Sequence, residues 1–396
     1  MEQAAVVFVD AARRAAVALG AGDWEIPVKR NARVAIIINH PHGHTPHHRA
    51  PAGPACAVGD PGQRLLWQIG KKRHAMLTIV RAFAEVALIV AVQAWMLVQV
   101  SFGYWRLCAR ARRAAATPVA AAPLPGDALL SVVIPAYREA ATIEATLRRV
   151  LSAAADPRRV EVVVVDAGGG DGTMAAARAV AADLAPTLRV DCAPSSRGGR
   201  GPAVAAGARA ARGAALLVLH GDTRLPSGFD ADVLAALRDP KTLATCFRFG
   251  VDRLALDGAL SSPRGSLLRR LQELPFAVME ATVAVRSRAL QLPFGDQALA
   301  LRRDTFEALG GFDDLAKLPI LEDFLLVHKL RVAGATGAGT IANLSTTAHC
   351  HPRRWLAKPV WRVNWTNQRV MVLFTYFGYT PLDIYELYYG TRDGAT

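Results

Sequence analysis

Polar residues with catalytic chemistry stand directly after short apolar runs, where predicted strands end. His220, Gly221 and Asp222 follow residues 215–219, a continuous apolar run of the length of a buried strand. Ligands of an open α/β sheet bind outside the carboxyl ends of its strands. An imidazole and a carboxylate at such an end can hold a divalent cation, so the triplet predicts the floor of an active site.

Three further apolar runs, at residues 130–134, 160–165 and 188–192, also end at polar or glycine-rich segments. Helical patterns separate these runs, and the alternation predicts an α/β fold with a mainly parallel central sheet. Because the carboxyl ends of parallel strands lie at one edge, we expect the four ends to form one pocket. The candidate site residues that follow these three runs are Pro135, Glu139, Asp166, Asp171, Arg197 and Arg200.

This mixture of carboxylates, arginines and glycines suits a diphosphate held through a divalent cation. Carboxylates alone would repel phosphate, whereas an Asp–metal–diphosphate bridge neutralises both charges. Asp166 can alternatively accept hydrogen bonds from a nucleoside, and Arg197 and Arg200 can reach phosphate oxygens that glycines allow to approach closely. The turn at 166–173 lacks the third glycine of a dinucleotide fingerprint, because position 173 is threonine. A nucleotidyltransferase, which shares such Asp clusters and glycine turns, is the alternative enzyme class.

The positive charge of the chain is concentrated away from these strand ends. The 396 residues carry a formal charge of +14. Residues 1–126 hold 15 Lys and Arg against 6 Asp and Glu, whereas residues 127–396 hold 32 against 27. A basic nucleic-acid-binding protein is a further alternative, suggested by the pI of about 10.1 and the Arg/Gly segment 197–201. Since the excess lies outside the predicted catalytic part, we expect no nucleic-acid partner.

Residues 86–105 form an uncharged apolar stretch of the length that crosses a bilayer as a helix. Basic residues flank both ends, and Tyr104 and Trp105 stand where interfacial aromatic residues belong. We predict a single-pass membrane anchor; a buried or interfacial helix is the alternative, because Gln93 and Gln99 dilute the stretch. The five cysteines are odd in number and form no CxxC pair, which favours a reducing compartment and a cytosolic catalytic domain.

The predicted domain organisation follows from these segments. Residues 1–75 form an N-terminal extension with a His-rich stretch at 40–48, residues 76–113 the membrane helix with its basic flanks, and residues 114–127 a linker rich in Ala and Pro. Residues 128–355 form the catalytic domain, and residues 356–396 an aromatic-rich helical tail. Within the catalytic domain, we expect a helix over 267–285 with a break at Pro275, and another that opens at Glu322 and Asp323.

The order of these motifs resembles that of family 2 glycosyltransferases, which have the GT-A fold. The resemblance rests on residues 131–139 (SVVIPAYRE), the turn 165–173 (VDAGGGDGT), the triplet at 220–222 and the pair at 322–323. The chain is most similar to the subgroup called radical-SAM/selenodomain-associated transferase 2. That likeness rests on residues 219–226 (LHGDTRLP), 291–297 (QLPFGDQ), 318–324 (LPILEDF) and 353–355 (RRW). It covers residues 128–379 and leaves out the N-terminal third.

The resemblance implies an enzyme that takes a sugar from a nucleotide-diphosphate sugar donor and passes it, with inversion, to an acceptor that remains unidentified. It implies a divalent metal, Mn²⁺ or Mg²⁺, on the diphosphate. It assigns the nucleoside of the donor to Pro135, Glu139 and Asp166, and the donor site is completed by Asp171, Arg197 and Arg200. Arg354 and Trp355 would line the donor or the acceptor side, and the acceptor side or its loop would include Gly295, Asp296 and Gln297. The resemblance assigns the metal to Asp222, with His220 as a second candidate ligand, and catalysis to Asp323 with Glu322, Asp323 as general base.

Two residues depart from the family pattern. Most members have Asp-x-Asp where this chain has His220-Gly221-Asp222, although the subgroup commonly has His there. The usual Asn before Glu139 is replaced by Arg138. Because Asp222 and Asp323 are both retained, we expect an active enzyme.

Overall fold

A computed structural model of the chain describes residues 28–29, 33–34, 61–111, 123–185, 187–195, 198–260 and 262–389. The chain divides into two units, Met1–Gln68 and Ile69–Thr396. In the first, β1 (Val28–Lys29) and β2 (Arg33–Val34) form an antiparallel pair. The His-rich stretch 40–48, Arg197 and most of the predicted linker lie outside the described residues.

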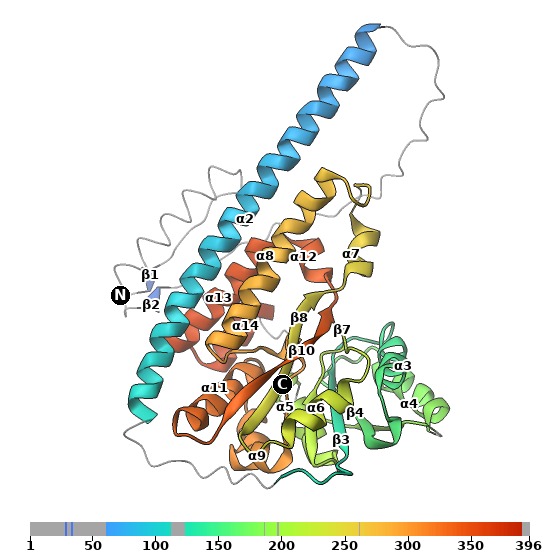
Figure 1. Cartoon of the computed structure of the whole chain (residues 1–396), viewed down its shortest axis with the longest axis vertical. Coiled ribbons are helices and arrows are strands. Elements are labelled where there is room, and N and C mark those ends of the chain that lie inside the picture. Colours follow the sequence, from blue (N-terminus) through green and yellow to red (C-terminus); the bar gives the residue numbers. More distant parts are fainter. Residues whose placement is uncertain are drawn as a thin grey trace. The chain divides into compact units, whose positions relative to one another are not determined.

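The second unit contains an eight-stranded sheet with the order β5-β4-β3-β6-β9-β8-β10-β7 (Figure 1). Strands β3 to β6 are parallel to one another, β9 is antiparallel to both β6 and β8, and β10 is parallel to β8. The predicted α/β fold with a mainly parallel sheet is confirmed. The strands are β3 (Leu130–Ala136), β4 (Val160–Asp166), β5 (Arg189–Ala193), β6 (Ala215–Val218), β7 (Thr223–Arg224), β8 (Thr242–Val251), β9 (Ala300–Arg302) and β10 (Thr340–Cys350).

Helices cover both faces of this sheet, because its central strands are apolar on both sides. Alternate residues of β3 show this: Val132 and Ile134 belong to one core cluster, and Val133 between them belongs to the other. Helices α3, α4 and α6 contribute to the first cluster, and α5, α9 and α11 to the second. The helices of the sheet unit are α3 (Ile143–Ala153), α4 (Thr173–Leu184), α5 (Arg200–Ala210), α6 (Phe229–Leu237), α7 (Arg253–Ala259), α8 (Leu267–Ala289), α9 (Arg303–Ala308), α10 (Gly311–Leu315), α11 (Glu322–Ala335), α12 (Arg353–Ala357), α13 (Val360–Phe377) and α14 (Pro381–Tyr389), with short 3₁₀ turns η1 (Pro157–Arg159) and η2 (Gly295–Gln297).

Two prolines, at positions 135 and 275, do not end the strand and the helix in which they lie. Strand β3 continues through Pro135, which lies beyond the last residue that β3 pairs with β6, so its missing N–H costs no ladder bond on that side. Helix α8 is continuous across Pro275, so the predicted break is wrong. Pro275 is buried, and its neighbours Phe276 and Met279 pack in a core cluster with Ile89, which offsets the lost helical hydrogen bond.

The predicted membrane segment lies within α2 (Pro61–Ala111), a helix of 51 residues that begins before the predicted interval 76–113. Its stretch Ile79–Gly103 has a mean hydropathy of 1.9 and is the one described helix that is long and apolar enough to cross a membrane. The predicted C-terminal tail begins inside α12 and otherwise consists of α13 and α14.

The glycines that open α5 permit close packing of protein against protein. A Cβ on Gly201 would overlap the carbonyl oxygens of Leu315 and Leu318. Gly199, at a φ of +113°, would place a Cβ 2.9 Å from the Cα of Pro319. We expected these glycines to make room for phosphate, but the space beside them is filled by the protein's own backbone. They let α5 begin against the segment that leads into α11.

Replacement of Gly201 tests this packing. We expect Gly201→Ala to lower the free energy of unfolding by about 1–3 kcal/mol, because backbone carbonyls cannot move aside cheaply. Gly258→Ala on α7 is the matched control: nothing lies within 4 Å of its added Cβ, and alanine favours a helix by roughly 1 kcal/mol. Urea denaturation followed by circular dichroism measures both. Equal effects at the two positions would contradict the packing argument.

Candidate active site

The turns after β3 and β4 are joined by hydrogen bonds to carboxylates. Asp166 at the end of β4 accepts hydrogen bonds from the backbone N–H groups of Gly168 at 2.9 Å and Gly169 at 3.1 Å. Asp171 accepts one from the N–H of Ala140 at 3.2 Å and another from the Thr173 hydroxyl, which lowers the pKa of Asp171. Asp171 thus connects the β4 turn to the β3 turn.

Arg353 at the start of α12 bridges two carboxylates from different strand ends. Its Nη2 lies 2.9 Å from Oε1 of Glu139 and 3.1 Å from Oδ2 of Asp222. The N–H of His351 also donates to the carbonyl oxygen of Asp222 at 3.0 Å. The segment before α12 is therefore fixed to the triplet by a side chain and by the backbone. Arg353 belongs to the motif 353–355, but the resemblance assigns a role only to its neighbours Arg354 and Trp355.

Asp323 lies in the first turn of α11, beside η2. Its Oδ2 accepts a hydrogen bond from the N–H of Gly295 at 2.8 Å, and its Oδ1 accepts one from the N–H of Phe324 at 2.7 Å. Burial alone would raise the pKa of Asp323, but the charge of Arg200 and the N–H of Gly295 outweigh it and lower the pKa. The carboxylate is therefore ionised at neutral pH.

His220 adjoins the same place from the end of β6. A Cβ on Gly295 would lie 2.5 Å from Nε2 of His220 and 3.0 Å from Oδ2 of Asp323. Only glycine at this position therefore leaves room for both side chains. Nε2 is buried and has no hydrogen-bond partner among the described residues. Burial and the nearby charge of Arg200 lower the pKa of His220 to about 4, so its ring is neutral at pH 7.

Glu322, next to Asp323, is ion-paired with the first residue of α5. Its Oε1 lies 2.8 Å from Nε of Arg200, and its side chain is buried. Burial raises the pKa of Glu322 to about 7, although Arg200 opposes the shift. Arg200, predicted to contact phosphate, is thus ion-paired with a residue predicted to act in catalysis.

The turn η2 contains one structural residue and one buried acid. Gln297 accepts a hydrogen bond from the Ser287 hydroxyl at 2.8 Å and donates to the carbonyl of Phe247 at 2.9 Å, which holds the turn against α8 and β8. Oδ1 of Asp296 is buried without a partner among the described residues. Burial raises the pKa of Asp296 to about 6, against the charge of Arg286. No sequence signal singled out Arg286, which is one of several arginines of α8 and lies in its last turn.

Arg354 and Trp355, both on α12, contact different parts of the fold. Arg354 donates to the hydroxyl of Tyr388 on α14, and its guanidinium carbon lies 5.3 Å from the centre of that ring. Trp355 packs edge-on against Phe249 of β8, with ring centres 5.9 Å apart. Trp355 is therefore placed as a packing residue beneath α12, whereas Arg354 is exposed beside the cluster.

The replacement of the family's usual Asn by Arg138 has a conformational consequence. Arg138 has a φ of +56°, in the left-handed region that Asn tolerates better than Arg. The backbone here is held in place because a Cβ on Gly169 would come 2.7 Å from the N atom of Arg138. The departure thus changes the residue but keeps a turn whose shape suits Asn.

The triplet contains two side chains of the kind that can hold a divalent cation. Asp222 offers carboxylate oxygens, and His220 offers a buried ring nitrogen without a partner. Within the described part of the chain, no group of three or more His, Cys, Asp or Glu side chains is arranged to hold a metal. A cation held by these two side chains would need further ligands from outside the described part of the chain.

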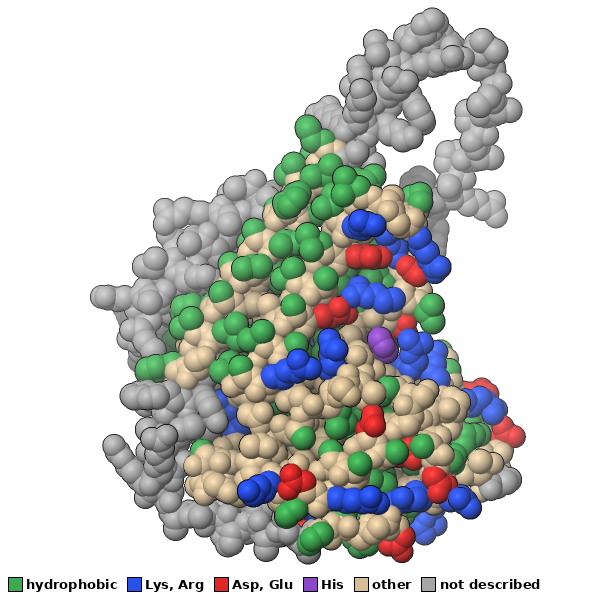
Figure 2. Space-filling view, viewed as in Figure 1, with side chains coloured by type: hydrophobic (Ala, Val, Ile, Leu, Met, Phe, Trp, Pro, Cys, Tyr) green, Lys and Arg blue, Asp and Glu red, His purple; other side chains and the backbone are tan. Residues whose placement is uncertain are grey.

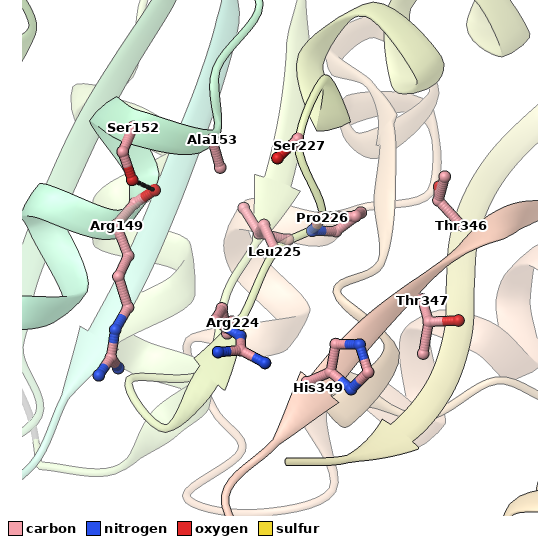
Figure 3. Close-up of a pocket in the computed structure, with 10 residues that line it drawn as sticks. All are labelled: Arg149, Ser152, Ala153, Arg224, Leu225, Pro226, Ser227, Thr346, Thr347 and His349. Carbon is pink, nitrogen blue, oxygen red and sulfur yellow. Dashed lines mark hydrogen bonds between the residues drawn. The ribbon is translucent and has the colours of Figure 1, made fainter. Parts of the chain in front are cut away.

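A separate cavity of about 370 Å³ lies between the end of α3, the segment after β7 and β10 (Figure 3). Its polar lining includes Arg149, Arg224 and His349, whose side chains lie along one side of it in the view. None of the candidate residues described above lines this cavity. It is not the site that the strand ends form.

A mainly parallel α/β sheet with carboxylates at its strand ends is the architecture of GT-A nucleotide-diphospho-sugar transferases. Residues 131–304 match the family model described as Glycosyl transferase family 2, which supports an enzyme of the glycosyltransferase type. The match ends before Asp323. It does not extend to the radical-SAM/selenodomain-associated subgroup, which these comparisons do not support.

Solved structures with similar folds include glycosyltransferases bound to nucleotide sugars. Mannosyltransferase PcManGT from Pyrobaculum calidifontis, in complex with GDP-Man and Mn²⁺, is 20% identical, with a TM-score of 0.44 over 77% of this chain and 81% of that one. S. aureus TarS 1–349, in complex with UDP-GlcNAc, is 14% identical, with a TM-score of 0.40 over 62% of this chain and 66% of that one. A search of curated proteins found no match.

The raised pKa of Asp296 predicts a pH dependence of stability. Because its folded-state pKa of about 6 lies above the ordinary value of 3.8, its contribution to stability is present below pH 4 and is lost as the pH rises through 6. We expect Asp296→Asn to reduce the loss of unfolding free energy between pH 4 and pH 8 by on the order of 2 kcal/mol. Urea unfolding at both pH values measures this, with Asp183→Asn on the surface of α4 as control. Parallel profiles for wild type and Asp296→Asn would contradict it.

Proposed function

We propose that the protein transfers a sugar from a nucleotide-diphosphate donor to an acceptor hydroxyl by a single inverting displacement, with Asp323 as general base. The observation that supports this most is the position of Asp323: an ionised carboxylate, fixed by the N–H of Gly295, next to the neutral His220 of the strand-end triplet. A fixed carboxylate that forms no ion pair with the residues described can accept a proton from an approaching hydroxyl.

The donor would lie across the ends of β3, β4 and β6. Pro135, Glu139 and Asp166 would contact the nucleoside, and Asp171 would keep their two turns together. Asp222 and His220 would hold Mn²⁺ or Mg²⁺, which would neutralise charge on the diphosphate. Arg353, already between Glu139 and Asp222, would add a second positive charge there. Arg354 is exposed on the same side and would reach the donor without moving α12.

The reaction then requires a base for the acceptor hydroxyl, positive charge beside the leaving group, and attack from the side opposite to that group. Asp323 takes the proton of the acceptor hydroxyl, and the oxygen attacks the anomeric carbon as the bond from that carbon to the diphosphate breaks. The nucleoside diphosphate leaves with the electron pair of the broken bond, where the positive charge of Arg353 favours it. Attack opposite to the leaving group inverts the anomeric centre. Asp296, buried on η2, would face the acceptor and accept one of its hydroxyl hydrogens once ionised.

Asp323→Asn tests the assignment of the base. We expect transfer to fall by about 10²–10⁴-fold, because an amide cannot take the proton, while the Kd for the donor stays within a few-fold of wild type. Release of nucleoside diphosphate from GDP- and UDP-sugars measures turnover, and calorimetry with Mn²⁺ present measures donor binding. Asp313→Asn is the matched control, because Asp313 is an exposed carboxylate on α10 that is ion-paired with Arg209 of α5.

Three outcomes would count against the proposal. Loss of donor binding in Asp323→Asn would move Asp323 from the acceptor side to the donor side. Release of pyrophosphate by the wild type would indicate the alternative, nucleotidyl transfer. Retention of the anomeric configuration in the product would exclude a single displacement.

We also propose that α2 attaches the enzyme to a membrane, with the catalytic domain on the cytosolic side. The apolar stretch Ile79–Gly103 supports this, together with the basic residues that flank it in the sequence.

A further inference from the structure

One face of α2 is fixed to the catalytic domain along most of the apolar stretch. Oε1 of Glu85 accepts a hydrogen bond from the N–H of Val360 at 2.6 Å. Three turns further on, Nε2 of Gln368 lies 2.8 Å from Sδ of Met96, and the hydroxyl of Tyr376 donates to the carbonyl oxygen of Gln99 at 3.0 Å. The whole length of α13, from Val360 to Tyr376, therefore contacts the segment of α2 from Glu85 to Gln99.

The elements beneath this face cannot enter a bilayer with it. Ile89 shares a core cluster with Phe276 of α8 and Val360 of α13. Helix α13 also carries Arg362, Asn364, Gln368 and Arg369 within its 18 residues, and α8 carries Arg269, Arg270, Arg286 and Arg288. Charged side chains cost several kcal/mol each at the centre of a bilayer. The face of α2 that holds Ile89 and Met96 thus belongs on the water side of any membrane.

The opposite face of α2 is apolar and exposed. Phe83, Val90, Val98 and Phe102 are 57%, 49%, 61% and 39% exposed, and they recur at helical spacing. Exposed alanines fill the positions between them, and Figure 2 shows apolar side chains gathered along this element. No charged residue occurs from 86 to 105. Because a water-facing helix surface is normally polar, this apolar face is expected to be covered by a partner or a membrane.

We propose that α2 lies in the plane of a membrane, with the face from Phe83 to Phe102 in one leaflet and the catalytic domain on the same side of the bilayer throughout. This inference rests on the membrane attachment proposed above and replaces a spanning helix by one that lies flat. A spanning helix would place the buried Gln93 and the bonded Glu85 in hydrocarbon, or else separate α2 from α13.

The charges around the stretch favour a lipid surface over a protein partner. In the sequence, basic residues stand at both ends of the apolar run, and they outnumber the one acidic residue of these flanks, Glu85, which is bonded to Val360. This excess of positive charge complements anionic headgroups. An apolar face bounded by basic residues at both ends is the arrangement of interfacial helices. The flanking residues are Lys71, Lys72, Arg73 and Arg81 before it, and Arg106, Arg110, Arg112 and Arg113 after it.

Vesicle flotation with the full chain tests the surface. We expect the wild type to float with phosphatidylcholine vesicles that contain phosphatidylglycerol. A double variant, Val90→Glu with Val98→Glu, should lose binding by at least about tenfold, since each charge must enter the leaflet. Ala231→Glu with Ala235→Glu, at exposed positions of α6, adds the same charge elsewhere and should float like the wild type. Urea midpoints of all three confirm that they are folded.

Protease protection separates the flat helix from the spanning one. In sealed membrane vesicles with epitope tags at both ends, a flat α2 leaves both tags open to protease from the same side, whereas a spanning α2 protects one of them. Protection of either tag, or flotation of the α2 double variant at the wild-type level, would overturn the inference. Failure of the wild type to float would overturn membrane attachment altogether. Neither result bears on sugar transfer, because donor turnover is measured separately.

Discussion

The site depends on the mutual compensation of buried charges. A buried carboxylate is costly unless a cation or several N–H groups face it, and most of the acids here have such partners. Arg353 faces Glu139 and Asp222, and Arg200 faces Glu322. Asp296 lacks a hydrogen-bond partner for Oδ1, and its pKa is raised accordingly. The environment therefore sorts chemically similar acids into different protonation states.

The close approach of α5 to the segment before α11 makes this compensation possible. Only a residue without a side chain fits at Gly201, and the next residue toward the N-terminus, Arg200, is thereby brought to Glu322. The same α11 start presents Asp323 to Gly295. Backbone strain accompanies this arrangement: Leu321, directly before Glu322, has a φ of +70°. Strain of this kind is retained where packing over-determines the backbone, and it gathers at functional sites.

The parts of the fold that could be predicted from sequence are those with local causes. Apolar runs that end at Asp166 and His220 have the length and flanks of buried strands, and the pair 322–323 opens a helix as its charges suggest. The arginine partners could not be predicted in this way. Arg353 lies 214 residues from Glu139, and a chain with 47 basic residues offers many equivalent candidates. Likewise, the packing role of the glycines at 199 and 201 could not be predicted, because the backbone that they contact lies more than a hundred residues away in the sequence. Without that partner, the glycines suggested a ligand.

The pairing of β10 has a consequence for how the chain folds during synthesis. Strand β10 is parallel to β8, with Thr340 opposite Thr242, so nearly a hundred residues must emerge from the ribosome before β8 gains its second neighbour. Until then, β8 presents an open edge of ten residues, a surface that other strands can pair with. Arg353, which follows β10 directly, cannot reach Asp222 earlier. The nascent chain therefore completes its sheet and its cluster of charges in the same late step.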